Sequence, residues 1–107
     1  ATWCGPCKES LPLLDEAYQE LKGKGVRAIA IETDGNGPGA REFSQTYNLR
    51  LPVAIDSGEV STQYGVSSIP YLVLIGADGN IKRVFRGVHS SEEIRRAVER
   101  ELSAQPR

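Results

Sequence analysis

The sequence predicts an α/β fold in one domain of 107 residues, with a mixed central sheet flanked by helices. Three observations support this prediction. Apolar residues recur at helical spacing over residues 8–21, directly after a pair of cysteines. Short apolar runs then alternate with further helical patterns. Finally, Asp78-Gly79 separates two apolar runs, which is the clearest hairpin signal in the chain.

The first half of the chain alternates helical and strand patterns. The first helix ends at the glycines that follow Leu21. Residues 26–31 are apolar apart from Arg27, as expected for an inner parallel strand covered by helices on both faces. Residues 34–39 have the composition of a loop. A short helix over residues 40–47 and a short strand over residues 52–55 follow.

The second half contains the hairpin and the last helix. A short helix is expected over residues 59–64, and strands over residues 71–75 and 81–86. Ser90 and Glu93 form a capping-box pattern ahead of the final helix. The sheet is therefore expected to be parallel in its first part, with an antiparallel hairpin at one edge.

Composition excludes several classes of function. The net charge is −1 and 25% of the residues are charged, so no nucleic-acid or membrane-surface partner is indicated. No apolar run approaches the roughly 20 residues of a membrane span. Two cysteines and one histidine, His89, are too few for a disulfide framework or a zinc site. We therefore expect neither a metal nor an organic cofactor.

The cysteine pair carries the chemistry. Cys4 and Cys7 stand at the start of the first helix, where free backbone N–H groups and the helix dipole favour a thiolate. We expect Cys4 to be an exposed nucleophile and Cys7 to resolve the mixed disulfide. The alternatives are a structural disulfide or two inert apolar side chains. A bridge across two residues closes too short a loop to stabilise the chain much.

The residues Trp3-Cys4-Gly5-Pro6-Cys7-Lys8 are similar to the active-site motif of thioredoxins, and Pro12 matches the proline that kinks their active-site helix. The wider chain resembles the TlpA/ResA branch of thiol–disulfide oxidoreductases, with a thioredoxin-like fold. Residues 34–56 resemble the helix–strand insertion of that branch. The segments that carry the resemblance are Ala1–Pro12, Tyr47–Asp56 and Val66–Gly87.

The resemblance implies a protein disulfide oxidoreductase in cell redox homeostasis and electron transport. The Gly-Pro dipeptide suggests a reducing couple, so the protein would act as a reductant. Its partners would be protein disulfides or thiols and an upstream reductase or membrane electron donor. A monomer in the bacterial periplasm, or anchored on the outer side of a membrane, is expected, with the cytoplasm as the alternative.

The resemblance also implies a substrate surface. Pro70, which follows Ile69, would be a cis proline opposite the cysteines, where an extended substrate could pair with the backbone. An ordinary proline at a strand start is the alternative. Trp3, beside the cysteines, is expected to be a partly exposed shield over the disulfide, with a core aromatic as the alternative. The expected substrate-binding residues are Trp3, Gly5, Pro6, Ile69, Pro70 and Gly87.

Two positions depart from the family pattern. Many TlpA/ResA-like chains carry glutamate where this chain has Ser10, and Glu9 would point about 100° away on the helix, toward solvent. The buried acid of thioredoxins would lie ahead of Ala1. His89 is expected to be a surface histidine, so no Cys–His pair is indicated.

The beginning of the chain predicts an N-terminally truncated domain over residues 1–107. There is no methionine, and Cys4 leaves no room for the strand that should feed the first helix. That strand would lie between residues 26–31 and 71–75. Burying about five or six of its apolar side chains contributes roughly 10 kcal/mol, comparable with a domain's net stability of about 5–15 kcal/mol. A strand supplied by a partner chain is the alternative.

Two other functions remain as alternatives. A redoxin-type peroxidase is disfavoured because the chain lacks a threonine-containing peroxidatic loop, and Cys-X-X-Cys suits dithiol exchange better. A non-catalytic thioredoxin-like binding module would use the two cysteines only as a local clasp.

Overall fold

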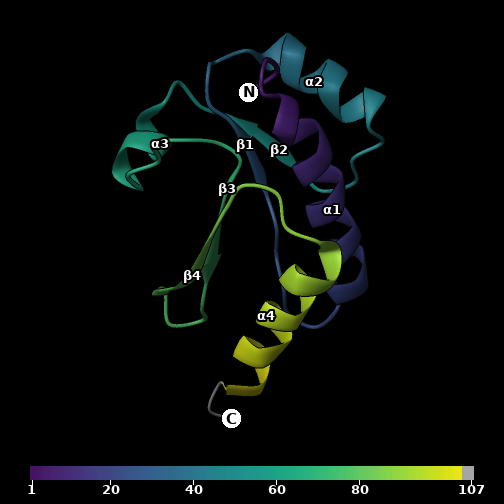
Figure 1. The fold of residues 1–107 in the computed structure, drawn as a ribbon, viewed down its shortest axis with the longest axis vertical. Coiled ribbons are helices and arrows are strands. Elements are labelled where there is room, and N and C mark those ends of the chain that lie inside the picture. The colour runs from purple at the N-terminus through teal and green to yellow at the C-terminus, as the bar shows by residue number, and fades with distance from the viewer. Residues whose placement is uncertain (105–107) are drawn as a thin grey trace.

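The computed structural model describes residues 1–104, which form an α/β fold (Figure 1). The α/β class and the order of elements agree with the sequence prediction. The helices are α1 (Gly5–Leu21), α2 (Gly37–Thr46), α3 (Glu59–Gln63) and α4 (Ser91–Ala104). The strands are β1 (Ala30–Glu32), β2 (Val53–Ile55), β3 (Tyr71–Ile75) and β4 (Ile81–Arg86).

Local capping interactions determine where two of the helices begin. α2 begins at Gly37, inside the expected loop, so the prediction of a loop over residues 34–39 is wrong at its end. The Asn36 side chain caps this helix by accepting from the Gly39 N–H at 3.0 Å, and a proline occupies the first turn. The expected cap of α4 is confirmed, because the Glu93 N–H donates to the Ser90 hydroxyl at 3.1 Å.

The four strands form two separate two-stranded sheets. β1 and β2 pair in parallel, with Ala30 opposite Val53. β3 and β4 form the expected antiparallel hairpin, with Tyr71 opposite Arg86 and a register shift after Leu74. Within residues 1–104, the two pairs are not hydrogen-bonded to each other.

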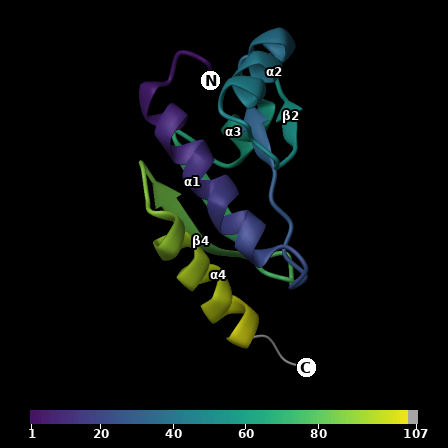
Figure 2. The same cartoon turned by 90° about the vertical axis from the view of Figure 1, so that its right-hand side faces the viewer.

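The core lies where α1 and α4 pack on one side of the hairpin (Figure 2). Ala17 of α1 is fully buried and packs with Phe85 of β4 and with Ile94 and Ala97 of α4. Leu72 and Leu74 of β3 and Leu14 of α1 surround this cluster. At the other end of the molecule, α2 and α3 lie near the N-terminus (Figure 1).

The prediction that residues 26–31 form an inner, fully covered strand is wrong. β1 contains only three residues, because its one partner, β2, is also three residues long. Ile29 and Ile31 are 54% and 39% exposed, and Ile75 of β3 is 47% exposed. Between β1 and β3 lies a cavity of about 280 Å³ whose lining includes Leu14, Ile29, Ile31 and Val73. Ile29 and Ile31 on one side and Ile75 on the other therefore give this space apolar walls.

Within the part of the chain that the structure describes, no helix is both long enough and apolar enough to cross a bilayer.

The open space between β1 and β3 leads to a stability prediction. We expect the 107-residue chain alone to lack a sharp thermal transition. An apolar strand buried in this space would contribute about 10 kcal/mol to the free energy of unfolding, and the chain alone lacks that contribution. Ala1 also lines the cavity, so a six-residue apolar strand fused to its amino group would enter between the two edges. Circular dichroism should then show a higher melting temperature and a steeper transition.

A fused segment of equal length made of serine and asparagine is the matched control, and it should stabilise nothing. Cooperative melting of the unfused chain as a monomer, with no gain from the apolar strand, would show that the space needs no strand.

Candidate functional site

The two cysteines form a disulfide at the start of α1. Their Cα atoms are 5.3 Å apart. Cys4 is the N-cap residue, with an extended backbone (φ −82°, ψ 104°), and its sulfur accepts a hydrogen bond from the Cys7 N–H at 3.2 Å. A side chain at an N-cap meets the free N–H groups of the first turn. The same geometry would stabilise a negative charge on the Cys4 sulfur after reduction.

The expectation that Cys4 is exposed is wrong for the disulfide form. Cys4 is 3% exposed and Cys7 is 5% exposed, whereas Gly5 and Pro6 between them are exposed. Cys7 lines the cavity beneath α1, and Cys4 is bonded to it. Gly5 and Pro6 are therefore the residues of the Cys-X-X-Cys motif that face solvent in this form.

The Ile69-Pro70 loop lies against the same cavity as Cys7. The peptide bond between Ile69 and Pro70 is cis, as the resemblance implies. Ile69, Pro70 and Cys7 all line the 280 Å³ cavity. The Gly87 N–H donates to the Pro70 carbonyl at 3.0 Å, and Gly87 has a positive φ of 78°, which a glycine adopts without strain. The fold thus brings together segments that are more than 60 residues apart.

Trp3 is held by an acid that sequence reasoning did not identify. Its indole is 71% exposed, and the indole N–H donates to the Asp34 carboxylate at 2.7 Å. Asp34 lies in the loop after β1. The carboxylate of Glu32, at the end of β1, accepts from the backbone N–H groups of Asp34 at 2.7 Å and Asn36 at 2.6 Å. Glu32 is only 5% exposed, so it is a buried anchor for this loop.

A second buried acid connects α1 to the segment before β2. Asp15 is 7% exposed and accepts from the backbone N–H groups of Arg50 at 2.9 Å and Leu51 at 3.1 Å. The signal in the sequence was an acid among the apolar residues of α1, next to Leu14. Glu32, which directly follows an apolar run, gives a similar signal.

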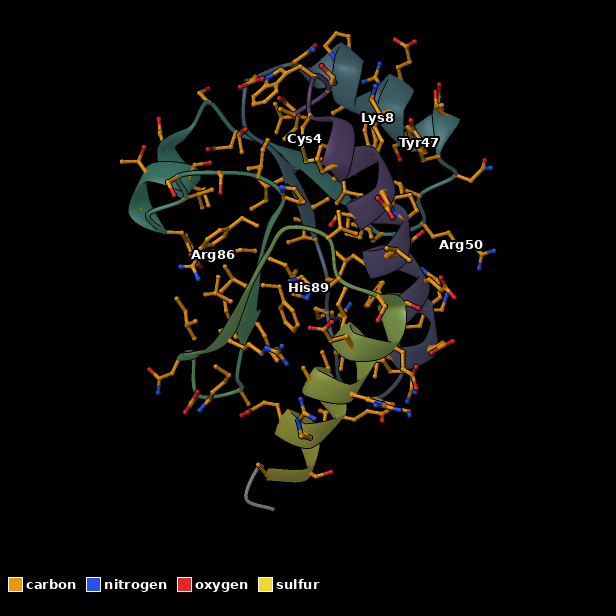
Figure 3. The ribbon with its side chains drawn as sticks, viewed as in Figure 1. Cys4, Lys8, Tyr47, Arg50, Arg86 and His89 are labelled. Carbon is orange, nitrogen blue, oxygen red and sulfur yellow. A yellow bond between two sulfur atoms is a disulfide. The ribbon has the colours of Figure 1, made fainter. Side chains whose placement is uncertain are left out.

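The remaining expectations concern groups that could exchange protons with the cysteines. Ser10 lines the cavity together with Cys7, and Glu9 is exposed, as expected. His89 is half-buried rather than a free surface side chain. Its Nδ1 lies 2.7 Å from the Glu93 carboxylate, and its Nε2 lies 2.9 Å from the Arg86 carbonyl oxygen. Figure 3 shows His89 between the hairpin and α4, whereas Cys4 lies at the start of α1.

Within residues 1–104, no group of three or more histidine, cysteine, aspartate or glutamate side chains is arranged to hold a metal ion.

Comparisons with known proteins agree on one family. A family model described as Redoxin matches residues 1–100. "Thiol-disulfide oxidoreductase ResA" of Bacillus thuringiensis subsp. konkukian (strain 97-27) is 37% identical over 94 residues, which are 87% of this chain and 54% of that protein. The chain therefore spans about half the length of this relative.

Solved structures show the same fold. A structure described as a putative thiol:disulfide interchange protein DsbE from Chlorobium tepidum superposes with a TM-score of 0.80 at 28% identity, covering 96% of this chain and 72% of that one. StoA from Bacillus subtilis superposes with a TM-score of 0.79 at 25% identity, covering 91% of this chain and 75% of that one.

The position of Cys4 at the helix start predicts an acidic thiol after reduction. In a Cys7→Ser variant, where only Cys4 can react, the rate of alkylation by iodoacetamide should reach half its maximum below about pH 8.5, the midpoint of an ordinary cysteine. The matched Cys4→Ser variant reports on Cys7, and we expect its midpoint to be higher. Equal midpoints near pH 8.5 would mean that the helix start does not activate Cys4.

Proposed function

This chain belongs to the redoxin family and is a TlpA/ResA-like member of the thioredoxin superfamily. From this premise we propose that it is a thiol–disulfide oxidoreductase. The observation that carries the proposal is the Cys4–Cys7 disulfide at the N-terminus of α1, with Cys7 on the same cavity as Pro70. The structure has the oxidised form of this pair.

The reaction exchanges one disulfide for another. In the reduced protein, the Cys4 thiolate attacks one sulfur of a substrate disulfide, so that a bond forms between Cys4 and the substrate and the other substrate sulfur leaves as a thiolate. Cys7 then loses its proton and attacks the Cys4 sulfur, which releases the second substrate thiolate and restores the disulfide. Two electrons pass to the substrate, whose thiolates take up two protons. No further cofactor enters this balance.

The substrate is a protein chain in an extended conformation. Gly5 and Pro6 between the cysteines are exposed, and the Ile69-Pro70 loop, with its backbone groups, lines the same cavity as Cys7. An extended segment can pair with such backbone groups while its disulfide reaches Cys4. We propose that Trp3 and Gly87 also belong to this substrate-binding surface. The names of the relatives, thiol–disulfide oxidoreductase and thiol:disulfide interchange protein, support protein thiols and disulfides as the substrate class.

The finer parts of the proposal rest on the family resemblance. The protein acts as a reductant, and a reductase or a membrane electron donor regenerates its dithiol. It works as a monomer on the outer side of the cytoplasmic membrane. None of these assignments requires a metal or a nucleic acid.

The two alternative functions use the same cysteines differently. A peroxidase would also act through a reduced Cys4, but the chain lacks a threonine-containing peroxidatic loop and Cys-X-X-Cys suits dithiol exchange better. A binding module would leave the disulfide unused. The position of the pair on an N-cap and beside Pro70 favours exchange chemistry over both.

Turnover of a protein disulfide tests the proposal directly. With dithiothreitol as the electron source, the natural protein should accelerate the reduction of insulin disulfides, followed as turbidity. A Cys4→Ser variant should lose at least about 100-fold of this rate, because no thiolate remains to attack. An exposed-site control, Glu16→Ala, should keep it. Rapid consumption of hydrogen peroxide without insulin reduction would favour the peroxidase, and no turnover of either would favour the binding module.

The order of the two cysteines has a separate test. A Cys7→Ser variant should accumulate a covalent adduct with a disulfide substrate, because the resolving thiol is absent. Non-reducing gel electrophoresis and mass spectrometry would detect the adduct at Cys4. The Cys4→Ser variant should trap little. Preferential trapping by Cys4→Ser would reverse the assigned roles.

A further inference from the structure

Trp3 combines high exposure with a fixed hydrogen bond. At 71%, it is the most exposed of the large apolar side chains in the described part of the chain. Its indole N–H is nevertheless bound to the Asp34 carboxylate at 2.7 Å. Tryptophan is enriched among the residues that contribute most to protein–protein binding. An indole that is held at one edge and open on its faces is suited to contact another molecule.

The backbone of the loop that carries Asp34 is fixed by hydrogen bonds to Glu32 and to Asp56. The buried Glu32 carboxylate accepts the N–H groups of Asp34 and Asn36. The Gly35 N–H between them donates to the Asp56 carbonyl at 2.8 Å. Three successive N–H groups of this loop, those of Asp34, Gly35 and Asn36, therefore have partners, so the Asp34 side chain starts from an ordered backbone.

An exposed hydrogen bond on a mobile loop would orient the indole weakly, because solvent competes for both partners. Here the backbone is ordered by bonds to a buried carboxylate, and bonds to charged acceptors are about twice as strong as neutral ones. Ordering a side chain before binding reduces the entropy that binding costs. The braced loop therefore prepares the indole for contact with a substrate.

We propose that Asp34 and, through it, Glu32 are positioning residues that hold the Trp3 indole as a preformed contact for the protein chain of the substrate. This inference rests on the proposed function for the substrate class. It assigns roles to two acids outside the Cys-X-X-Cys motif, one of them 31 residues from Trp3 along the chain. Protein substrates should depend on this contact, whereas a small disulfide that reaches only the sulfur atoms should not.

The first experiment measures the hydrogen bond without using activity. In the natural protein labelled with 15N-tryptophan, the indole N–H signal of Trp3 is the one lost in Trp3→Phe. Its exchange with water should become several-fold faster in Asp34→Ala, which has no acceptor. Asp34→Asn keeps an acceptor oxygen and should restore slow exchange. Glu32→Gln should give intermediate exchange, because an amide oxygen can accept only part of what the carboxylate accepts.

The second experiment measures substrate binding. For insulin, Asp34→Ala and Trp3→Phe should each raise KM on the order of fivefold with little change in kcat, the loss of about one net hydrogen bond. The double variant should be no worse than either single variant. For hydroxyethyl disulfide, which is too small to span the surface, all variants should match the natural protein. Glu16→Ala, more than three helical turns from Cys4, is the matched control.

The outcomes separate the two proposals. Faster indole exchange in Asp34→Ala with unchanged KM for insulin would overturn the substrate contact while leaving the oxidoreductase intact. Equal losses with insulin and with hydroxyethyl disulfide would also overturn it, because they would indicate damage to the disulfide site. Unchanged indole exchange would overturn the positioning role itself. A natural protein that reduces neither disulfide would remove the proposed function, which the indole measurement does not depend on.

Discussion

The packing of α1 against the hairpin and α4 determines where both halves of the candidate site lie. Ala17 is fully buried, and its small side chain lets α1 pack closely against Phe85 and against α4 at Ala97. The same helix carries Cys4 and Cys7 at its start. Leu72 and Leu74 of β3 belong to the same core, and Pro70 directly precedes that strand. One apolar cluster therefore places the disulfide and the proline loop on a common cavity.

Pro12 lies inside α1 and removes one N–H from its hydrogen-bond ladder. The helix continues to Leu21 nevertheless, because the residues after the proline are the ones that form the core. Stability is thus supplied by the second half of α1, while the first half presents the cysteines. This division leaves the N-cap free for chemistry, since little of the apolar packing depends on it.

Local sequence pattern was sufficient to predict most of the fold. β3 and β4 have the expected bounds, and α1, α3 and α4 differ only at their ends, because period and caps determine such elements within a short window. The bounds of β1 could not be predicted, since the length of a strand depends on its neighbours and only three residues of β2 pair with it. α2 begins early because Asn36 caps it, an interaction of one side chain with the backbone.

In the candidate site too, some residues were predictable from the local sequence and others were not. The cysteine pair and the Ile69-Pro70 loop were identifiable from motif and resemblance, because each consists of adjacent residues. The burial of Cys4 was not identifiable, since it depends on tertiary packing rather than on the adjacent residues. Nor was Asp34, whose bond to Trp3 joins residues 31 positions apart. A single sequence contains no local signal for a contact of that range.

In this chain, carboxylates accept backbone N–H groups that strand pairing would satisfy if the strands were longer. Asp15, Glu32 and Asp56 each accept two backbone N–H groups, from the segment before β2, the loop after β1 and the start of α3, respectively. Such N–H groups need partners where they are shielded from water. Each bond to a charged acceptor contributes about 1.5–3 kcal/mol, comparable with burying one apolar side chain. The loop that carries Asp34 is ordered by the Glu32 carboxylate together with the backbone bond from the Gly35 N–H to the Asp56 carbonyl. It follows that the orientation of Trp3 depends on the Asp34 acceptor and on the one buried carboxylate, Glu32, that orders the backbone beside it.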